Sequence, residues 1–131
     1  MRYLLDTNAV IALLNDSRSN LARRTRQEQP GDIAISAIVA HELFYGAFKS
    51  RRVEHNTALI DALRFEVVEF NKEDARRAGE VGAHLAARGT LIGPYDVLIA
   101  GQALARGMVL VTRNTGEFGR VPRLRIENWD A

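Results

Sequence analysis

The stretch YLLDTNAVIALL, residues 3–14, decides how the N-terminal region is interpreted. An apolar run ends at Asp6, Thr7 and Asn8 follow, and a second apolar run then begins with helical spacing. Asp, Thr and Asn all cap helices, because their side chains accept hydrogen bonds from the unpaired N–H groups of a first turn. Alternatively, Asp6 ends the first strand of a parallel sheet, and ligands bind beyond the carboxyl ends of such strands. The second interpretation requires further acidic residues at the same place.

Composition limits the class of protein. The chain has 131 residues, of which 47% are apolar, and this suits one domain over residues 1–131 with a single core. It contains no cysteine, which excludes disulfides and thiolate metal sites. No apolar stretch approaches the roughly 18 residues of a membrane span, and the N-terminus lacks the pattern of a signal peptide. We therefore expect a cytoplasmic protein with no membrane partner.

The kind of basic residue is more informative than the net charge of +2. Of the 18 Lys and Arg residues, only Lys49 and Lys72 are lysines. The planar guanidinium of Arg matches the geometry of phosphate oxygens, so the composition permits a nucleic-acid partner. An ordinary solvated surface explains any single Arg pair equally well.

Strand patterns alternate with helix patterns along the chain. Short apolar strands are expected at residues 3–5, 33–35, 67–68, 108–111 and 124–126. Helices are expected at residues 9–14, 18–27, 37–47, from the basic turn to about 64, 72–88 and 94–106. This alternation predicts an α/β fold, a three-layer α/β/α sandwich with a central, mostly parallel sheet of four to five strands.

Two further acidic residues lie on apolar helical faces. Glu42, in SAIVAHELFYGAF, shares a face with Ile38 and Gly46, because residues four apart align on a helix. An ionised Glu on such a face needs either a salt bridge or a metal ion. Asp96, in GPYDVLIAGQALARG, shares its face with Ile99, although the helix dipole also favours an acid in a first turn.

These acids can meet at one edge of the sheet. If the first and fourth strands are neighbours, their carboxyl ends bring Asp6, Glu42 and Asp96 together. Carboxylates without partners repel one another, and clusters of oxygen ligands suit Mg²⁺ or Mn²⁺. The fourth strand ends at Thr112, so Asn114 also follows a strand end, where it could simply form a turn.

The motifs together resemble a known family. LLDTN, HELFYGA, GPYDVLIA, LVTRNTGEF and RIENW occur in this order over essentially the whole chain. They resemble the PIN-domain ribonucleases, and specifically the VapC-type toxins of bacterial toxin–antitoxin pairs. The resemblance implies Mg²⁺-dependent cleavage of RNA, often tRNA, with Mn²⁺ as a possible substitute. The matching catalytic and metal-binding acids are Asp6, Glu42 and Asp96, with Asp6 and Asp96 as the principal ligands.

The resemblance also implies supporting residues and partners. Asn8 and Thr112 match polar positions that orient the site. PIN domains frequently carry a fourth acid near the end of the fourth strand, and this chain has Asn114 there, so we expect one resident metal ion and a second recruited by the substrate. The implied partners are a second copy of the chain in a homodimer and a VapB-type antitoxin whose tail occupies the active-site groove. Promoter DNA is expected to bind only through the antitoxin complex.

Two other functions compete with this interpretation. A phosphatase with an aspartyl-phosphate intermediate typically needs a second Asp two residues after the nucleophile, and position 8 is Asn. A non-enzymatic RNA- or DNA-binding module with an Arg-rich surface leaves Glu42 and Asp96 unexplained. The three histidines, His41, His55 and His84, show no metal-ligand spacing.

Overall fold

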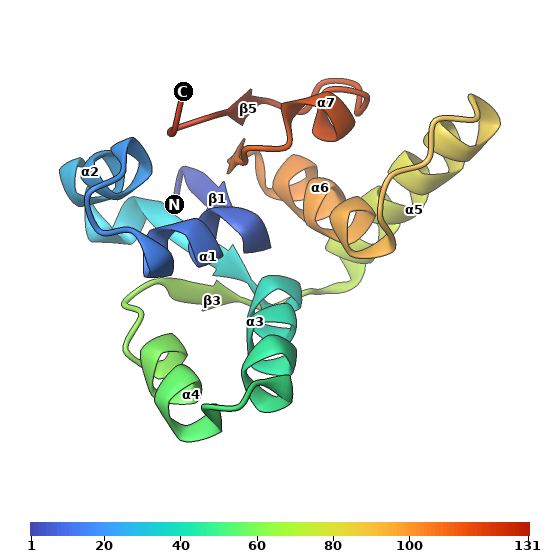
Figure 1. The fold of residues 1–131 in the computed structure, drawn as a ribbon. Coiled ribbons are helices and arrows are strands. Elements are labelled where there is room, and N and C mark those ends of the chain that lie inside the picture. The colour runs from blue at the N-terminus through green and yellow to red at the C-terminus, as the bar shows by residue number, and fades with distance from the viewer.

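Five parallel strands form one sheet in a computed structural model that describes residues 1–131 (Figure 1). Their order across the sheet is β3-β2-β1-β4-β5. The strands span Tyr3–Leu5 (β1), Ile33–Ser36 (β2), Glu66–Val68 (β3), Val109–Val111 (β4) and Ile126–Glu127 (β5). The parallel sheet and the neighbouring positions of the first and fourth strands are thereby confirmed.

The central strand, β1, explains why its sequence is wholly apolar. Leu4 pairs with Ala34 of β2 on one side and with Leu110 of β4 on the other. All three residues of β1 are buried, as expected for a strand that is covered on both faces. Ladder pairing continues to Asp6, whose N–H donates to the carbonyl of Val111. The carboxyl ends of β1 and β4 therefore lie side by side.

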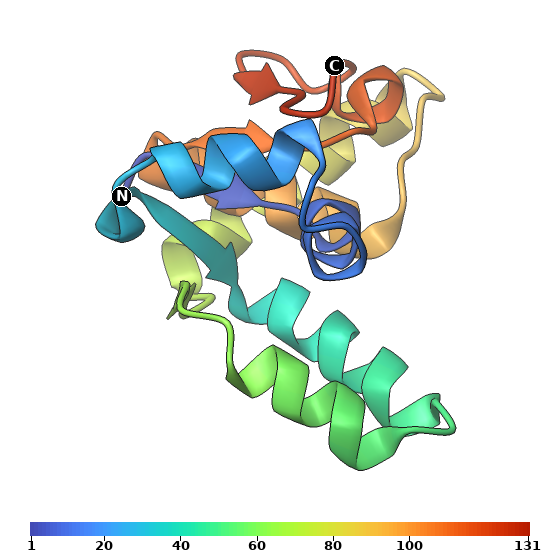
Figure 2. The same cartoon turned by 60° about the vertical axis from the view of Figure 1, so that its left-hand side comes forward.

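Helices cover both faces of the sheet (Figures 1 and 2). Helices α5 and α6 pack along each other, and α3 and α4 lie side by side and extend away from the sheet (Figure 2). No helix combines the length and the apolar character that crossing a membrane requires. The helices span Thr7–Asn15 (α1), Asn20–Gln27 (α2), Ala37–Lys49 (α3), Val53–Asp61 (α4), Lys72–Ala87 (α5), Pro94–Arg106 (α6) and Thr115–Phe118 (α7), with a short 3₁₀ turn at Pro30–Asp32.

Polar side chains cap the first turns of five of the seven α-helices, and a glycine ends helix α6. The side chains that cap first turns belong to Asp6, Ser19, Ser36, Asn71 and Asn114. Each accepts a hydrogen bond from a backbone N–H that would otherwise have no partner. Helix α6 ends at Gly107, whose φ of 63° lies in the left-handed region that favours glycine.

Several expected boundaries differ from the structure by one to three residues, and one helix was not expected. Helix α2 begins at Asn20 rather than at residue 18, because the Ser19 side chain caps it by accepting from the N–H of Ala22. Helix α4 ends at Asp61 rather than near residue 64. The four-residue helix α7 was not expected, because four residues are too few for an apolar periodicity.

The contact between α5 and α6 is unusually close at one point. A Cβ atom placed on Gly101 would lie 2.4 Å from the Cα of Ala78, so no larger residue fits at position 101 without moving backbone. Nearby, the fully buried carboxylate of Asp74 accepts hydrogen bonds from Gln102 and Arg106 of α6. Burial opposes ionisation of Asp74, but these bonds hold its pKa below the usual value. The two helices are thus held together by close packing of their backbones and by the hydrogen bonds from Gln102 and Arg106 to Asp74.

Candidate active site

Asp6 fills both roles that the sequence left open. Its side chain is only 3% exposed. Oδ1 accepts a 2.8 Å hydrogen bond from the N–H of Ala9 and so caps α1, and Oδ2 accepts a 2.6 Å bond from the Thr112 hydroxyl at the end of β4. Burial raises the pKa of Asp6, these two bonds counteract the rise, and the charge of Glu42 adds to it. Capping and placement at the site are therefore compatible.

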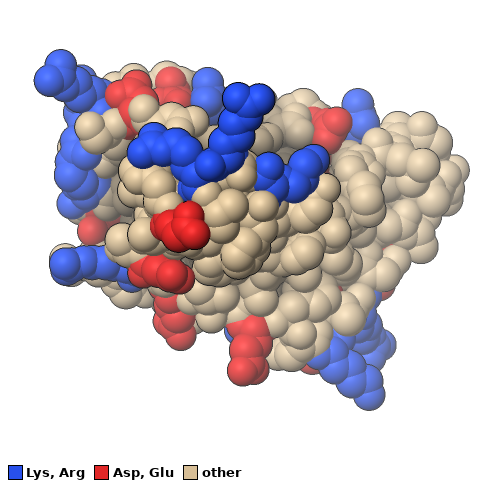
Figure 3. Space-filling view, turned by 60° about the horizontal axis from the view of Figure 1, so that its bottom comes forward, with Lys and Arg blue, Asp and Glu red and all other residues tan.

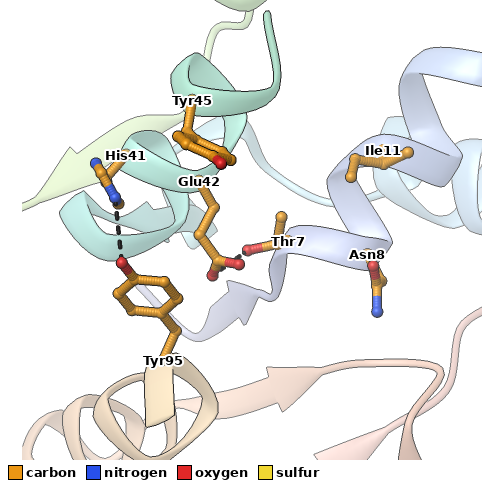
Figure 4. Close-up of a pocket in the computed structure, with 7 residues that line it drawn as sticks. All are labelled: Thr7, Asn8, Ile11, His41, Glu42, Tyr45 and Tyr95. Atoms are coloured by element: carbon orange, nitrogen blue, oxygen red, sulfur yellow. Dashed lines mark hydrogen bonds between the residues drawn. The ribbon is translucent and has the colours of Figure 1, made fainter. Parts of the chain in front are cut away.

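Glu42 reaches the site from the middle of α3. Its Oε1 accepts a 2.8 Å hydrogen bond from the hydroxyl of Thr7, the first residue of α1 (Figure 4). None of the four salt bridges in the structure involves Glu42, so the salt bridge considered as an alternative does not form. The sequence favoured a functional carboxylate at Glu42. The structure shows in addition that the Thr7 hydroxyl orients this carboxylate.

Asp96 lies in the first turn of α6 and is half-buried. It accepts no hydrogen bond from the rest of the chain, unlike Asp6 and Glu42. Burial raises the pKa of Asp96 to about 6, and the negative charges of Asp6, Glu42 and Glu117 contribute in that order. The three expected acids therefore share one electrostatic environment, although they lie on elements that are far apart in the sequence.

Glu117 is a fourth acid near the site, and it was not among the candidate residues expected from the sequence. It lies in the first turn of α7, and its charge acts on Asp96. The side chain of Asn114 holds it: Nδ2 donates to Glu117 Oε2 at 3.0 Å, and Oδ1 accepts from the Glu117 N–H at 3.4 Å. The three-residue spacing between Asn114 and Glu117, which is typical of a capped first turn, was the available signal.

The other two expected supporting residues differ in their contacts. Thr112 donates to Asp6 and accepts from the N–H of Asn114, so its hydroxyl connects the ends of β1 and α7. Asn8 is exposed on α1, and Figure 4 shows its side chain directed away from Glu42. Asn8 lines the site without a hydrogen bond to any of the acids.

A hollow of about 690 Å³ opens beside Glu42. Figure 4 shows Glu42 and Thr7 in its middle, Asn8 and Ile11 of α1 on one side, and aromatic side chains of α3 and α6 on the other. Its volume lies within the range of about 300–1,000 Å³ that is typical of ligand sites. The seven residues that line it are Thr7, Asn8, Ile11, His41, Glu42, Tyr45 and Tyr95.

The donor set fits a divalent cation that retains some of its water. In this structure, no group of three or more Asp, Glu or His side chains is arranged so that it could hold a metal ion. However, all candidate donors are carboxylate oxygens, and the raised pKa values of Asp6 and Asp96 reflect burial and repulsion that a cation would relieve. Mg²⁺ typically uses one or two carboxylates and keeps several waters, so an open group of acids suits it.

Basic side chains do not form one continuous patch on the face shown in Figure 3. Lys and Arg side chains lie there in separate groups, with acidic side chains among them and a broad uncharged area beside them. This distribution gives no support on that face for a module that binds nucleic acid through basic residues alone.

Comparisons with known proteins match this geometry. Residues 3–124 match the PIN domain. The chain is 39% identical to the tRNA(fMet)-specific endonuclease VapC of Salmonella typhimurium, over 98% of both chains. It is 37% identical to Ribonuclease VapC2 of Haemophilus influenzae, again over 98% of both.

The chain belongs to the PIN-domain family and, within it, to the VapC ribonucleases. A solved structure of DNA-bound VapBC from Salmonella typhimurium superposes with a TM-score of 0.94, at 39% identity and with 98% of each chain covered. The PIN-like α/β fold and the ribonuclease class that the sequence motifs implied are confirmed. In this VapC chain, the cluster of acids lies at the carboxyl edge of the sheet, where open α/β folds bind ligands.

Proposed function

We propose that this chain is a metal-dependent endoribonuclease toxin that hydrolyses phosphodiester bonds in RNA. The observation that carries the proposal is the convergence of Asp6, Glu42 and Asp96 from three separate elements at one sheet edge. Burial raises the pKa of Asp96 to about 6, and the charges of Asp6 and Glu42 add to this rise, which supports the proximity of the three acids. None of the three acids forms a salt bridge, so charge pairing with Lys or Arg does not explain why they lie together.

Asp6 and Asp96 would be the principal metal ligands, and Glu42 would complete the group. Mg²⁺ is the proposed ion, with Mn²⁺ as a substitute, because both prefer oxygen ligands. A divalent ion at this place supplies positive charge that polarises a phosphoryl oxygen and lowers the pKa of a water molecule. Glu117, whose charge acts on Asp96, adds a fourth carboxylate to this group.

The chain's own residues position the reacting groups. Thr112 and the N–H of Ala9 fix both oxygens of Asp6, and Thr7 fixes one oxygen of Glu42. Each of Glu42 and Asp96 has at least one carboxylate oxygen without a hydrogen bond inside the protein, and such an oxygen can accept the proton of the attacking water. A hydrolytic site of this kind requires one carboxylate that is held by fixed donors, here Asp6, and others that keep a free oxygen, here Glu42 and Asp96.

The proposed substrate and partners follow the relatives. We assign tRNA as the substrate class because a relative with 39% identity over nearly its full length is named a tRNA(fMet)-specific endonuclease. A cognate VapB-type antitoxin is the proposed inhibitor, and promoter DNA would be bound through the antitoxin complex, as in the DNA-bound VapBC assembly. The cytoplasm is the proposed compartment and a homodimer the proposed assembly.

One assay tests the function. The purified chain is mixed with tRNA(fMet) and with total RNA, in Mg²⁺ or in EDTA, beside the variant Asp6→Asn. Cleavage by the wild-type chain only in Mg²⁺, together with loss of cleavage and an unchanged circular dichroism spectrum in Asp6→Asn, supports the proposal. Binding without cleavage would instead support the alternative of a non-enzymatic module, and equal rates in the two proteins would reject the metal site.

A further inference from the structure

Three aromatic side chains in the hollow contribute little to the core. Tyr45 is 58% exposed and Tyr95 is 44% exposed, and His41 is also exposed. Figure 4 shows the tyrosine rings on opposite sides of the Glu42 carboxylate, one from α3 and the other from α6. Large aromatic surfaces that face an open hollow require an explanation other than folding.

Two of the three aromatic residues directly precede one of the acids in the chain. His41 precedes Glu42 on α3, and Tyr95 precedes Asp96 on α6. Successive residues on a helix point about 100° apart, so the rings line the surface directly beside the acids. A polymer held by its phosphate at the acids would place its neighbouring unit against these rings.

The rings are held in place before any ligand binds. The centroids of His41 and Tyr95 are 5.7 Å apart in an edge-to-face arrangement, and the Tyr95 hydroxyl lies 3.4 Å from Nε2 of His41. Tyr45 packs near His41 at 6.5 Å, and the ammonium of Lys49 lies 5.2 Å from the Tyr45 ring centre. A fixed ring loses little conformational entropy on binding, which favours a specific stacking surface.

We propose that His41, Tyr45 and Tyr95 form a binding site for one unpaired nucleobase of the RNA, next to the phosphate that is cleaved. This inference rests on the proposed ribonuclease function and specifies the form of its substrate. Bases in single-stranded RNA stack on aromatic side chains, whereas bases in a duplex are not available for this. Asn8 and the tyrosine hydroxyls, which border the same hollow, can hydrogen-bond the edge of a stacked base.

The test asks whether removing one aromatic ring and removing one base of the RNA have the same effect on cleavage. The cleavage site of the wild-type chain is first mapped in total tRNA, and the cleaved stem-loop is then synthesised with a single abasic nucleotide at each of the three positions on either side. For one position next to the cut, we expect kcat/KM of the wild-type chain to fall roughly 10-fold, as for loss of a stacked base. Tyr45→Ala and Tyr95→Ala should lose a similar factor on the intact RNA and show little further loss on that abasic RNA.

Matched variants separate stacking from folding. Tyr45→Phe and Tyr95→Phe keep the ring and should keep the abasic effect. Phe48→Ala removes an exposed aromatic one turn farther along α3, outside the hollow, and should cleave all the RNAs like the wild-type chain. Thermal melts of all variants check that the exposed positions do not alter stability.

Three results would overturn the inference. If the wild-type chain and the Ala variants lose the same factor on every abasic RNA, the rings do not bind a base. If the Ala variants cleave normally but resist inhibition by a VapB-type antitoxin, the rings bind a peptide. If the wild-type chain cleaves no RNA, the proposed function fails as well, and this result is distinct from the other two.

Discussion

The hydroxyl of Thr112 donates a 2.6 Å hydrogen bond to the buried carboxylate of Asp6, across a separation of 106 residues in the chain. This bond joins the carboxyl ends of β4 and β1, the two central neighbours in the sheet. Because Ala9 occupies the other oxygen of Asp6, Thr112 fixes the remaining freedom of the carboxylate. The position of the principal acid therefore depends on a neutral side chain in a distant part of the sequence.

Thr112→Val tests this relationship. The substitution keeps the shape of the side chain but removes the donor, and a hydrogen bond to a charged group typically contributes about 1.5–3 kcal/mol. We expect the free energy of unfolding to fall by about 1–2 kcal/mol and kcat for RNA cleavage to fall roughly 10-fold, a loss in the range seen for residues that support metal ligands. Denaturant unfolding and steady-state kinetics measure the two effects. Thr112→Ser should retain both properties, and its failure to do so would implicate the methyl group.

Asp96→Asn should raise stability and abolish cleavage. The pKa of Asp96 is raised to about 6 in the folded chain, from near 3.9 in the unfolded chain. The folded state therefore binds the proton more tightly, which stabilises it at low pH, and this stabilisation is lost as the pH rises through 6. At neutral pH without metal, the neutral amide removes this penalty. Since Asp96 is half-exposed, we discount for solvent and expect about 1 kcal/mol, or about 3–5 °C in Tm.

The pH dependence provides the control for that variant. In EDTA, the Tm difference between Asp96→Asn and the wild-type chain should shrink as the pH falls from 7 to 4, because wild-type Asp96 then becomes protonated. Added Mg²⁺ should stabilise the wild-type chain far more than the variant, since a ligand of the folded state stabilises it by mass action. A variant that is less stable than the wild type at pH 7 would identify Asp96 as a helix-capping acid instead.

Glu117→Gln tests the fourth acid. Removing its charge should lower the pKa of Asp96 and shift the Mg²⁺ midpoint of cleavage to a concentration roughly 10-fold higher, as is common when a residue near the ligands is changed. Asn114→Asp is the companion variant: it replaces the amide donor to Glu117 with a like charge at the 3.0 Å contact. We expect it to weaken α7 and cleavage together. A lower Mg²⁺ midpoint in Asn114→Asp would show that position 114 itself faces the metal.

Two glycine substitutions test the contact between α5 and α6. Gly101→Ala should lower the free energy of unfolding by about 1–3 kcal/mol or more, because the new methyl group would meet backbone atoms of Ala78. Gly79→Ala, on α5, has open space around its Cβ position and should raise stability by about 0.5–1 kcal/mol through helix propensity. Urea unfolding of both variants measures these changes. If Gly101→Ala left the free energy of unfolding unchanged, the helices could move apart without cost.

Local patterns in the sequence were sufficient for much of the fold. The apolar stretches of β1, β2 and β4, and the capping residues Ser36 and Asn71, identify strands and helices by their own chemistry. The sequence singles out Asp6, Glu42 and Asp96 as candidate site residues because each is a charged residue at a strand end or on an apolar helical face. The extent of the domain over residues 1–131 stays a prediction.

Other features depend on contacts between distant segments. The Thr7 hydroxyl orients Glu42 between α1 and α3, and the backbone of Ala78 leaves no room for a Cβ atom at Gly101. The sequence does not show which of these elements lie next to each other. Glu117 was missed because its place at the site depends on α7, a helix too short to leave a periodic pattern. These residues are determined by packing geometry, which local spacing does not encode.

The central position of β1 has a consequence for the order in which the protein is synthesised. Strand β1 is synthesised first, but it can pair with β4 only after nearly all of the chain has left the ribosome. The hydrogen bond from Thr112 to Asp6 forms equally late. Until then, β1 lacks one of its two neighbouring strands, and one oxygen of Asp6 lacks the hydroxyl that positions it. We therefore expect the chain to cleave RNA only when its synthesis is almost complete.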